Sequence, residues 1–187
     1  VNANYKNNKT DFIFGGSFSS YNGDYFGEVI WAKFASNSQI RDRYYDGNSK
    51  KNDFSTFAKA TYRLNEKISL YGDLQLRFVD YKTFGTNSNR EVFMINENYK
   101  FFNPKAGITY KLNKKNHLYF SYARANREPS RSDFKNNLNI KPEQLNDFEL
   151  GWRHAYKKFI INTNAYVMLY NEKLVLTGAI SNVGKPI

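Results

Sequence analysis

The sequence predicts an all-β chain, an antiparallel up-and-down meander that is a fragment of a transmembrane β-barrel with about seven strands. Apolar residues recur with a period of two on one side of several segments, as in strands that separate two different solvents. Tight turns and long polar connections alternate between these segments, which is typical of membrane-spanning barrels. The aromatic fraction of 18% is high for a soluble domain and fits strands whose ends carry interfacial rings.

The first predicted strand covers residues 10–21. It follows residues 1–9, which are polar and show no pattern typical of a strand or helix. Phe12, Phe14 and Phe18 fall on one side of it. Residues 22–53 are expected to form a long connection, in which residues 44–48 (YYDGN) give the clearest turn signal. Within this connection, residues 28–35 either extend a strand or pack inside the loop.

Two strands follow at residues 54–64 and 68–82, joined by a tight turn at 65–67. Apolar residues occupy the even positions from Ile68 to Phe78, apart from one glycine, and polar residues with Tyr71 occupy the odd positions. The second strand is longer than the usual strand of about five or six residues. It matches the ~9–11 tilted residues that cross a bilayer.

The second half of the chain repeats this unit. Its predicted elements are a long connection at 83–103, strands at 104–112 and 117–126 around a turn at 113–116, a long connection at 127–146, strands at 147–155 and 159–170 around a turn at 156–158, and the start of another connection at 171–187. Aromatic residues gather near the ends of the strands, where the rings of membrane proteins lie among headgroups. They are Tyr62, Tyr81, Tyr110, Trp152, Tyr156 and Phe159.

The composition excludes several classes of protein. The chain of 187 residues has no cysteine, hence no disulfides or thiolate metal sites, and no apolar run approaches the ~20 residues of a membrane helix. The net charge of +11 would suit nucleic acid, but residues 22–53 and 83–103 carry equal numbers of acidic and basic side chains. The excess charge lies in turns and on strand faces rather than in one stripe, so no nucleic-acid partner is predicted.

Four stretches of the sequence resemble the barrel of TonB-dependent outer-membrane receptors. They are GGSFSSYNGDYFGEVIWA (15–32), YFSYARANREPSRSDF (119–134), KPEQLNDFELGWRH (141–154) and NAYVMLYNEKLVLTGAISNVG (164–184). Pro142-Glu143 followed by DFELG (147–151) is the most specific motif, and LVLTG (174–178) reinforces it. The resemblance covers most of residues 10–187 and is strongest to the branch that imports iron complexes and cobalamin.

This resemblance implies a barrel of about 22 strands in the outer membrane of a Gram-negative bacterium, filled by an amino-terminal plug. It implies import of a siderophore, haem or cobalamin, energised through TonB. We expect residues 1–187 to be one partial barrel domain excised from a longer chain, because the sequence shows neither a plug nor a closing strand. Any activity would then belong to the parent chain.

Basic residues on the polar side of the predicted strands are expected to line the lumen and to contact the plug, which would be acidic or rich in hydrogen-bonding groups. They are Lys59, Arg63, Arg77, Lys105, Lys111 and Arg153. The apolar side would face lipid, because backbone groups in a membrane pair only within a closed ring. The turn lysines at 114–115 and 157–158 either contact lipid phosphates or keep the turns soluble.

Substrate recognition is expected in the external loops, because rigid strands position loops that bind. The candidate residues are Arg41, Arg43, Tyr44, Tyr45, Arg90, Arg127 and Arg131. Arginine and aromatic side chains suit a carboxylate- or catecholate-bearing metal complex, or a porphyrin. The same arginines could instead bridge lipopolysaccharide phosphates or pair with Asp42, Glu91, Glu128 and Asp133.

Two other functions stay open at this point: a barrel enzyme, and a soluble or surface β-protein that binds glycans on exposed aromatic side chains. An enzyme would need a nucleophile or acid near His117 or His154, the only histidines, and the sequence around them shows no catalytic pattern. We therefore predict no enzymatic activity, no cofactor and no metal ligands.

Overall fold

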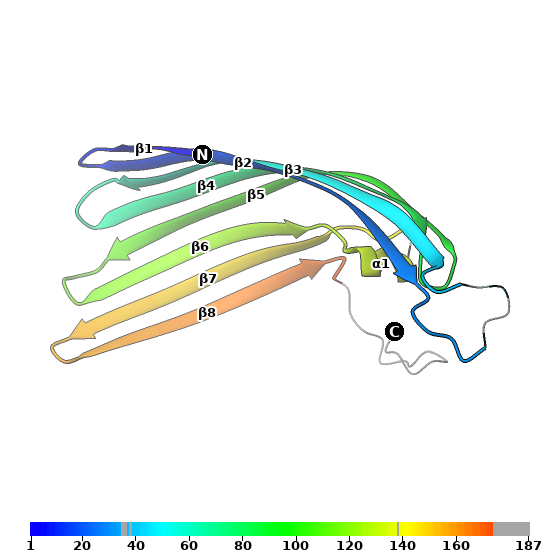
Figure 1. The fold of residues 1–187 in the computed structure, drawn as a ribbon. Coiled ribbons are helices and arrows are strands. Elements are labelled where there is room, and N and C mark those ends of the chain that lie inside the picture. The colour runs from blue at the N-terminus through cyan, green and yellow to red at the C-terminus, as the bar shows by residue number, and fades with distance from the viewer. Residues whose placement is uncertain (35–36, 38, 138, 174–187) are drawn as a thin grey trace.

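The computed structural model describes residues 1–34, 37, 39–137 and 139–173, which form eight strands and one short helix (Figure 1). The strands are β1 (Asn2–Lys6), β2 (Thr10–Glu28), β3 (Arg43–Arg63), β4 (Ile68–Thr86), β5 (Val92–Lys111), β6 (Asn116–Arg127), β7 (Glu143–Tyr156) and β8 (Phe159–Asn171). The helix, α1 (Arg131–Asn136), lies between β6 and β7 in the chain.

The strands form one antiparallel sheet in which each strand pairs with the next along the chain. Four connections of two to four residues lie at one end, which we name the turn end (Figure 1). The connections at 29–42, 87–91 and 128–142 lie at the opposite end, which we name the loop end. Among the described residues β1 and β8 each pair on one side only, so the sheet is open, and the predicted all-β meander of a partial barrel is confirmed.

One strand more is present than the seven predicted. β1 was missed because its sequence, NANYK, carries no apolar alternation. Its residues are all exposed, and it is held by backbone pairing with β2, where Asn2 lies opposite Gly15. The other seven strands match the predicted segments to within one residue at the turn end, where residues 64 and 112 fall outside β3 and β5, and extend each of them toward the loop end.

The long connections predicted at 22–53 and 83–103 are wrong over most of their length. β2 continues to Glu28 and β3 begins at Arg43, so residues 44–48, read as a turn, lie inside a strand. β4 and β5 are joined by the five residues 87–91. Beyond Phe78 the buried apolar residues lie at odd positions, among them Val79, Phe93 and Ile95, and even positions such as Asp80 and Asn96 are polar. The alternation of the first half of β4 is therefore interrupted while the backbone ladder continues.

The remaining connections agree better with the sequence. Residues 29–34 follow β2 outside any strand, and Ile30, Trp31 and Phe34 are 83%, 75% and 86% exposed, so these residues neither extend a strand nor pack within the connection. The predicted loop at 127–146 is a connection from 128 to 142 that contains α1. The expected loop at 171–187 falls outside the described residues from 174 onward.

One face of the sheet carries α1 and a small core. Phe134 of α1 is 2% exposed and packs with side chains that are also buried, namely Val79, Phe93, Ile95, Tyr99 and Phe101. These residues occupy odd positions of β4 and β5, and the register places odd positions of β2, β3, β6 and β7 on the same side. We name this side the helix-side face. Figure 1 shows α1 beneath the arch that the sheet forms at its loop end.

The other face, which we name the opposite face, carries an exposed apolar band toward the turn end. Its members include Phe14, Phe18, Phe54, Leu70, Leu74, Leu76, Phe78, Phe102, Ile108, Phe120, Phe148, Leu150, Ile161, Val167 and Leu169. Leu74 is 53% exposed and Phe18 67% exposed, although both lie in the middle of long strands. A soluble monomer rarely exposes more than a few hundred Å² of contiguous apolar surface, so this band fits contact with lipid.

Five of the six aromatic residues predicted at membrane interfaces lie on the opposite face. Tyr62, Tyr110, Trp152, Tyr156 and Phe159 are each at least 36% exposed there. Tyr81 is a correction: it occupies an odd position of β4 and packs against the core on the helix-side face. In the described part of the chain, no helix is long and apolar enough to cross a membrane.

Candidate functional site

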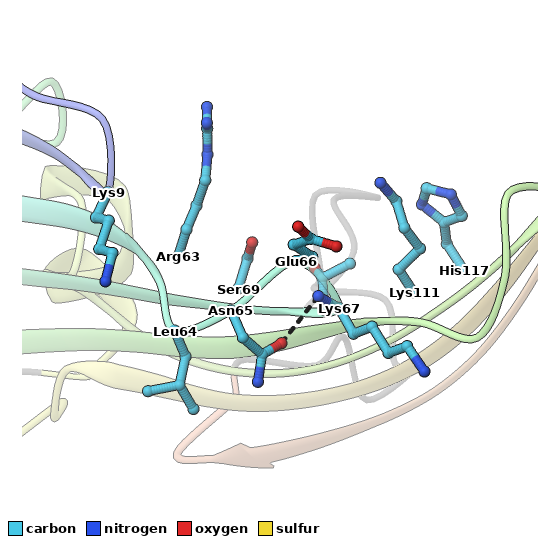
Figure 2. Close-up of a pocket in the computed structure, with 10 residues that line it drawn as sticks. Lys9, Arg63, Leu64, Asn65, Glu66, Lys67, Ser69, Lys111 and His117 are labelled. Atoms are coloured by element: carbon cyan, nitrogen blue, oxygen red, sulfur yellow. Dashed lines mark hydrogen bonds between the residues drawn. The ribbon is translucent and has the colours of Figure 1, made fainter.

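A basic hollow of about 850 Å³ opens at the turn end of the helix-side face. Its lining includes Arg63 from β3, Lys111 from β5 and His117 from β6, whose side chains rise on the same side of the ribbon (Figure 2). Arg153 of β7 lies directly opposite His117 in the register. The register therefore places three of the six predicted lumen residues in one group at this end.

The other predicted lumen residues lie farther along the same face and have partners. Lys59 lies over the ring of Tyr71, with its Nζ 5.5 Å from the ring centroid. Lys105 Nζ lies 3.9 Å from Asp73 Oδ2. Arg77 belongs to a larger ionic cluster, described below. All six basic residues predicted to share a side do so in the structure.

The loop end of the helix-side face is covered by residues 128–137, which we name the α1 segment. Ser130 caps the helix: its Oγ accepts a hydrogen bond from Asp133 N, and the Asp133 carboxylate accepts one from Ser130 N at 2.7 Å. This reciprocal pair satisfies backbone donors that a helix start leaves unpaired. The buried ring of Phe134 then fixes the helix on the sheet.

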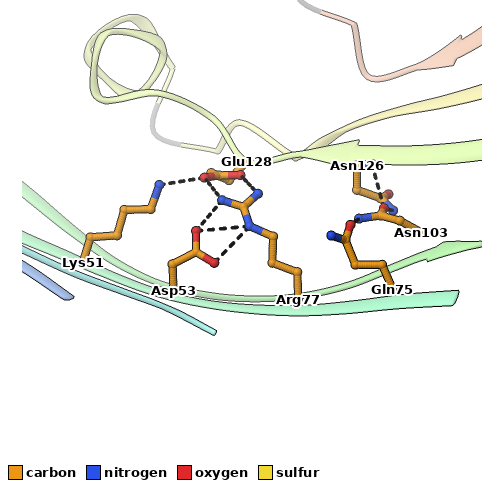
Figure 3. Close-up of polar contacts among 7 residues, drawn as sticks. All are labelled: Lys51, Asp53, Gln75, Arg77, Asn103, Asn126 and Glu128. Carbon is orange, nitrogen blue, oxygen red and sulfur yellow. Dashed lines mark hydrogen bonds and ion pairs between the residues drawn. The ribbon is translucent and has the colours of Figure 1, made fainter. Parts of the chain in front are cut away.

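Four charged residues anchor the start of the α1 segment to β3 and β4 (Figure 3). The Glu128 carboxylate accepts two hydrogen bonds from Arg77, at 2.7 and 2.8 Å, and one from Lys51 Nζ at 2.7 Å. The same Arg77 guanidinium donates through Nε to both carboxylate oxygens of Asp53 at 3.1 Å. The Glu128 side chain is only 14% exposed, so solvent screens this cluster little.

The charge state of Glu128 follows from these contacts. Burial alone would raise the pKa of Glu128, but the hydrogen bonds from Arg77 and Lys51 outweigh it and lower the pKa to about 2. Glu128 is therefore ionised at neutral pH. The cluster is a folded-state anchor that joins residues 51 positions apart in the chain.

Side-chain amides join β5 and β6 where their backbone pairing stops. The ladder between these strands ends at Lys105 opposite Ala123, although β6 continues to Arg127. Beyond that point Asn103 Oδ1 accepts hydrogen bonds from Asn126 N at 3.0 Å and Asn126 Nδ2 at 2.8 Å, and Asn103 Nδ2 donates to Gln75 Oε1 (Figure 3). The amides replace the missing ladder, and β6 leads into the α1 segment from a fixed position.

A second hollow, of about 450 Å³, lies beside the α1 segment at the loop end. Its lining is Tyr25, Tyr45, Ser88, Ser130, Arg131 and Ser132. The Arg131 guanidinium lies over the ring of Tyr25, with its Cζ 3.6 Å from the ring centroid and 5.5 Å from the centroid of Phe93. Among the described residues Arg131 takes part in no ion pair. The hollow thus combines an uncompensated cation, phenol rings and three hydroxyls.

Of the seven predicted substrate residues, the structure brings Tyr45 and Arg131 together in this hollow. Arg41 and Arg90 lie in connections and adopt positive φ angles of 73° and 65°. Arg127 ends β6 and pairs with Glu143 at 3.1 Å. These three side chains are exposed.

Three of the predicted loop residues belong to a strand instead, which corrects their expected location. Arg43, Tyr44 and Tyr45 begin β3, because β2 and β3 stay paired to Glu28 opposite Arg43. The Arg43 guanidinium lies 4.1 Å from the centroid of Phe26, and the Tyr44 ring meets Tyr45 edge-on at 4.9 Å. Tyr44 is the unpaired residue of the bulge between Gly27 and Glu28, and its ring lies with that of Tyr45 beside Gly27.

Sequence reasoning missed Tyr25, Lys51 and Asp53, which were assigned to a loop. It considered Glu128 only as a partner for nearby loop arginines, whereas Arg77 binds it. The capping signal of Ser130 followed three residues later by Asp133 was available and would have located α1. The described residues contain no group of three or more histidine, aspartate or glutamate side chains able to hold a metal ion.

The profile of a family described as TonB dependent receptor-like, beta-barrel matches residues 1–185. Comparison with curated protein sequences gives no match.

Solved structures agree with the family match. The ferric-catecholate import receptor Fiu from E. coli K12 has a TM-score of 0.66 and 14% identity over 99% of this chain and 32% of its own. The copper transporter OprC has a TM-score of 0.70 and 14% identity, over 90% of this chain and 28% of its own. The ferric yersiniabactin uptake receptor FyuA from Yersinia pestis has a TM-score of 0.62 and 13% identity, over 88% of this chain and 27% of its own. The family and these neighbours are transport receptors, not enzymes. The chain spans about a third or less of their length, and it belongs to the TonB-dependent receptor-like β-barrel family.

Proposed function

We propose that this chain is part of the wall of an outer-membrane receptor that binds an anionic metal complex at its loop end and imports it in a TonB-dependent way. The observation that carries the proposal is the Arg131 guanidinium, which lies on Tyr25 without a carboxylate partner among the described residues. A stacked guanidinium keeps its donors in one plane, and such a fork suits catecholate or carboxylate oxygens.

The position of this hollow supports a binding role. It lies on the helix-side face, which becomes the interior when the arch closes into a barrel, and at the end with the longer connections. Outer-membrane barrels place longer loops on the external side. Two solved neighbours are described as ferric-catecholate and ferric yersiniabactin receptors and a third as a copper transporter, so ferric siderophores come first among possible cargoes.

The other partners in this proposal follow from the same orientation. A plug supplied by the parent polypeptide would contact the basic helix-side face, and TonB would act through that plug. The apolar band would face lipid. Exposed loop-end arginines such as Arg41 and Arg90 would contact lipopolysaccharide phosphates. The outer membrane of a Gram-negative bacterium is therefore the proposed location.

The test is Arg131→Gln in the full-length receptor, with binding of a ferric catecholate measured by quenching of intrinsic fluorescence. We expect affinity to fall about 10- to 100-fold, because a charge-assisted hydrogen bond contributes about 1.5–3 kcal/mol. Lys100→Gln is the matched control: it removes one positive charge from an exposed position on the opposite face and should change affinity less than about twofold. Equal affinities of wild type and Arg131→Gln for every ferric siderophore tried would exclude this site.

The soluble glycan-binding alternative is disfavoured by the apolar band. Exposed side chains such as Leu150, at 57%, and Val167, also at 57%, lie between aromatic residues in a continuous surface rather than as isolated rings. A glycan platform would need scattered aromatic side chains in a polar surface, whereas this band suits acyl chains.

A further inference from the structure

The outer half of β5 is paired on one side only. Its ladder with β4 continues to Val92, whereas its ladder with β6 ends at Lys105 opposite Ala123. Pro104 stands where the pairing with β6 stops, and a proline has no N–H to donate to a neighbouring strand. Figure 1 shows β5 continuing into the arch past the end of β6.

The backbone groups on this unpaired side belong to the even positions of β5. Lys111 N donates to Lys67 O beside β4 at 2.7 Å, whereas Phe102 O accepts from Asn126 Nδ2 on the β6 side at 3.1 Å. Successive residues of a strand direct their N–H and C=O groups to opposite sides, and the register has no bulge in β5. Within the described part of the chain, no hydrogen bond reaches the outward N–H and C=O groups of Val92, Met94, Asn96, Asn98 and Lys100.

Residues 92–100, which we name the β5 edge, differ from the edges at β1 and β8. Those strands lie at the ends of the described sheet, whereas both neighbours of β5 are present and one of them stops short. The β5 edge is roughly 27 Å long and has no proline and no bulge. Proteins protect exposed edges with such features, so an edge without them is suited to pair with a further strand.

The two faces beside the β5 edge differ in what covers them. On the helix-side face Phe93 and Ile95 are buried beneath α1. On the opposite face Met94 and its register partner Phe84 are 65% and 66% exposed, and a hollow of about 320 Å³ adjoins them. A strand added at the β5 edge from the outer side would cover both of these exposed side chains.

A second copy of the chain does not fit the β5 edge. Two such edges paired antiparallel are related by a twofold axis perpendicular to the wall, which would turn one barrel upside down in the membrane. Two edges paired in parallel are related by an axis along the strands. Because barrel strands are tilted by about 35–45°, the membranes of the two copies would then not coincide.

The described connections are engaged elsewhere. The α1 segment lies on the helix-side face, where Glu128 and the buried ring of Phe134 hold it. The connection at 87–91 joins β4 to β5 itself, and the connection at 29–42 joins β2 to β3, which is two strands away. The β5 edge therefore remains open at the end of the wall that the proposed orientation places outside the cell.

We infer that the β5 edge binds an extended segment of a second protein, which adds to the sheet as one more strand on the external side of the membrane. Hydrogen bonds to the even positions hold its backbone, and alternate side chains pack beside Met94 and Phe84. Lys100 takes part in no ion pair among the described residues, so an acidic residue at that end of the segment fits. The inference rests on the proposed orientation of the wall and not on the cargo.

Amide hydrogen exchange tests whether the edge is open in the receptor and covered in the cell envelope. Exchange is measured residue by residue on the full-length receptor, once purified in detergent and once in native outer membranes. The even positions from 92 to 100 should exchange fast when purified and at least tenfold more slowly in native membranes. Phe93, Ile95 and Glu97, whose N–H groups face β4, are the matched control and should be slow in both samples.

Two results of this experiment would overturn the inference. Slow exchange of the even positions in the purified receptor would mean that the receptor covers its own edge. Fast exchange of these positions in both samples would mean that nothing pairs with the edge.

A proline variant tests whether strand pairing causes the protection. Asn96→Pro removes one outward N–H and spares the ladder with β4, as Pro104 does on the same strand. Asn96→Ala is the matched control, because it removes the same side chain and keeps the N–H. With a photo-crosslinking phenylalanine analogue at Asn98, Asn96→Pro should lower the adduct yield in native membranes at least fivefold, and Asn96→Ala should leave it within twofold. Equal yields in the two variants contradict strand addition.

The identity of the adduct decides what pairs with the edge. Mass spectrometry should find a peptide of a second protein, whereas a receptor peptide, a lipopolysaccharide adduct or no adduct overturns the inference. If Asn96→Pro fails to reach the membrane, the exchange of the wild-type receptor decides alone. Binding of a ferric catecholate, measured in parallel, depends on Arg131 and not on Asn96, so failure here is distinguishable from failure of the proposed function.

Discussion

At the scale of single residues, Glu128 has an unusual set of partners for a residue in a connection. Arg77 and Lys51, both on the sheet, donate to its carboxylate, and Asp53 holds Arg77 from the other side. Removing one member of such a cluster leaves the others partly buried without a counter-charge, which costs more than losing an exposed ion pair. Glu128 therefore holds the start of the α1 segment on the sheet, while the buried Phe134 ring holds the helix.

We predict that Glu128→Gln weakens the anchoring of the α1 segment by about 1–3 kcal/mol, because Arg77 and Lys51 lose a charged acceptor. Hydrogen exchange of residues 130–137 in the full-length receptor should become faster, while exchange in β7 stays unchanged. Glu143→Gln is the control, since its partner Arg127 is 62% exposed and the pair contributes less than about 1 kcal/mol. Equal exchange in the two variants would contradict the prediction.

The same residue gives a pH dependence with a definite sign. The folded pKa of about 2 lies below the ordinary value of 4.5, so ionised Glu128 stabilises the α1 segment fully above about pH 4.5. That contribution declines as the pH falls and is lost below about 2. Pepsin cleavage within residues 128–137 should therefore increase from pH 4.5 to pH 2 in the wild type. Glu128→Gln should be cleaved readily throughout, with little further increase from this site.

At the scale of elements, β3 and β4 approach closely at the loop end because two glycines face each other there. Gly85 has a φ of 146°, a value that L side chains rarely adopt, and its register partner is Gly47. A Cβ at Gly85 would collide with the backbone of Asp46 and Gly47, which cannot move aside as a flexible side chain can. The close approach lets the strands continue paired well beyond the apolar band.

We predict that Gly85→Ala destabilises the loop end by about 1–3 kcal/mol, through backbone strain and the collision with β3. Gly72→Ala, on the same strand, meets nothing within 4 Å and should change stability by less than about 0.5 kcal/mol. Urea unfolding of the full-length receptor, followed by tryptophan fluorescence and by proteolysis at residues 87–91, measures the change in stability of each variant. The strain argument fails if the two variants unfold alike.

At the scale of the whole molecule, the described sheet is open and one of its faces is apolar. β1 and β8 each lack a second partner among the described residues, and the band on the opposite face needs a covering. Strand edges with unpaired backbone groups recruit further strands, and an uncovered apolar surface promotes association. A closed ring of strands in lipid pairs the free strand edges and covers the apolar band.

We predict that residues 1–187 produced alone in buffer without detergent associate into large particles rather than remaining a monomer. Light scattering measures the particle size, and detergent above its micellar concentration should reduce it by covering the band. A monodisperse monomer in plain buffer would mean that the sheet buries its apolar face by another arrangement.

The sequence alone determined the alternation of the strands and the order in which they pair. Side chains of a strand alternate by backbone geometry, so the two faces could be assigned from local pattern, and the cations from Lys59 to Arg153 were placed on one side correctly. Short turns between consecutive strands leave little choice of topology other than a meander. The side-chain alternation and the pairing of consecutive strands depend on residues that are close in sequence, so both can be predicted from the sequence alone.

Only the tertiary structure decided how far the strands extend and what closes the loop end. The outer parts of β2 and β3 are rich in polar residues, and in the outer parts of β4 and β5 the apolar side chains change to the helix-side face. The pattern of the apolar band therefore does not continue there, and the pairing rests on register carried over from that band. Glu128 meets Arg77 across 51 positions, and Arg131 meets Tyr25, because the α1 segment lies across the helix-side face of the curved sheet. Such contacts depend on the curvature of the whole sheet, which no short stretch of sequence encodes.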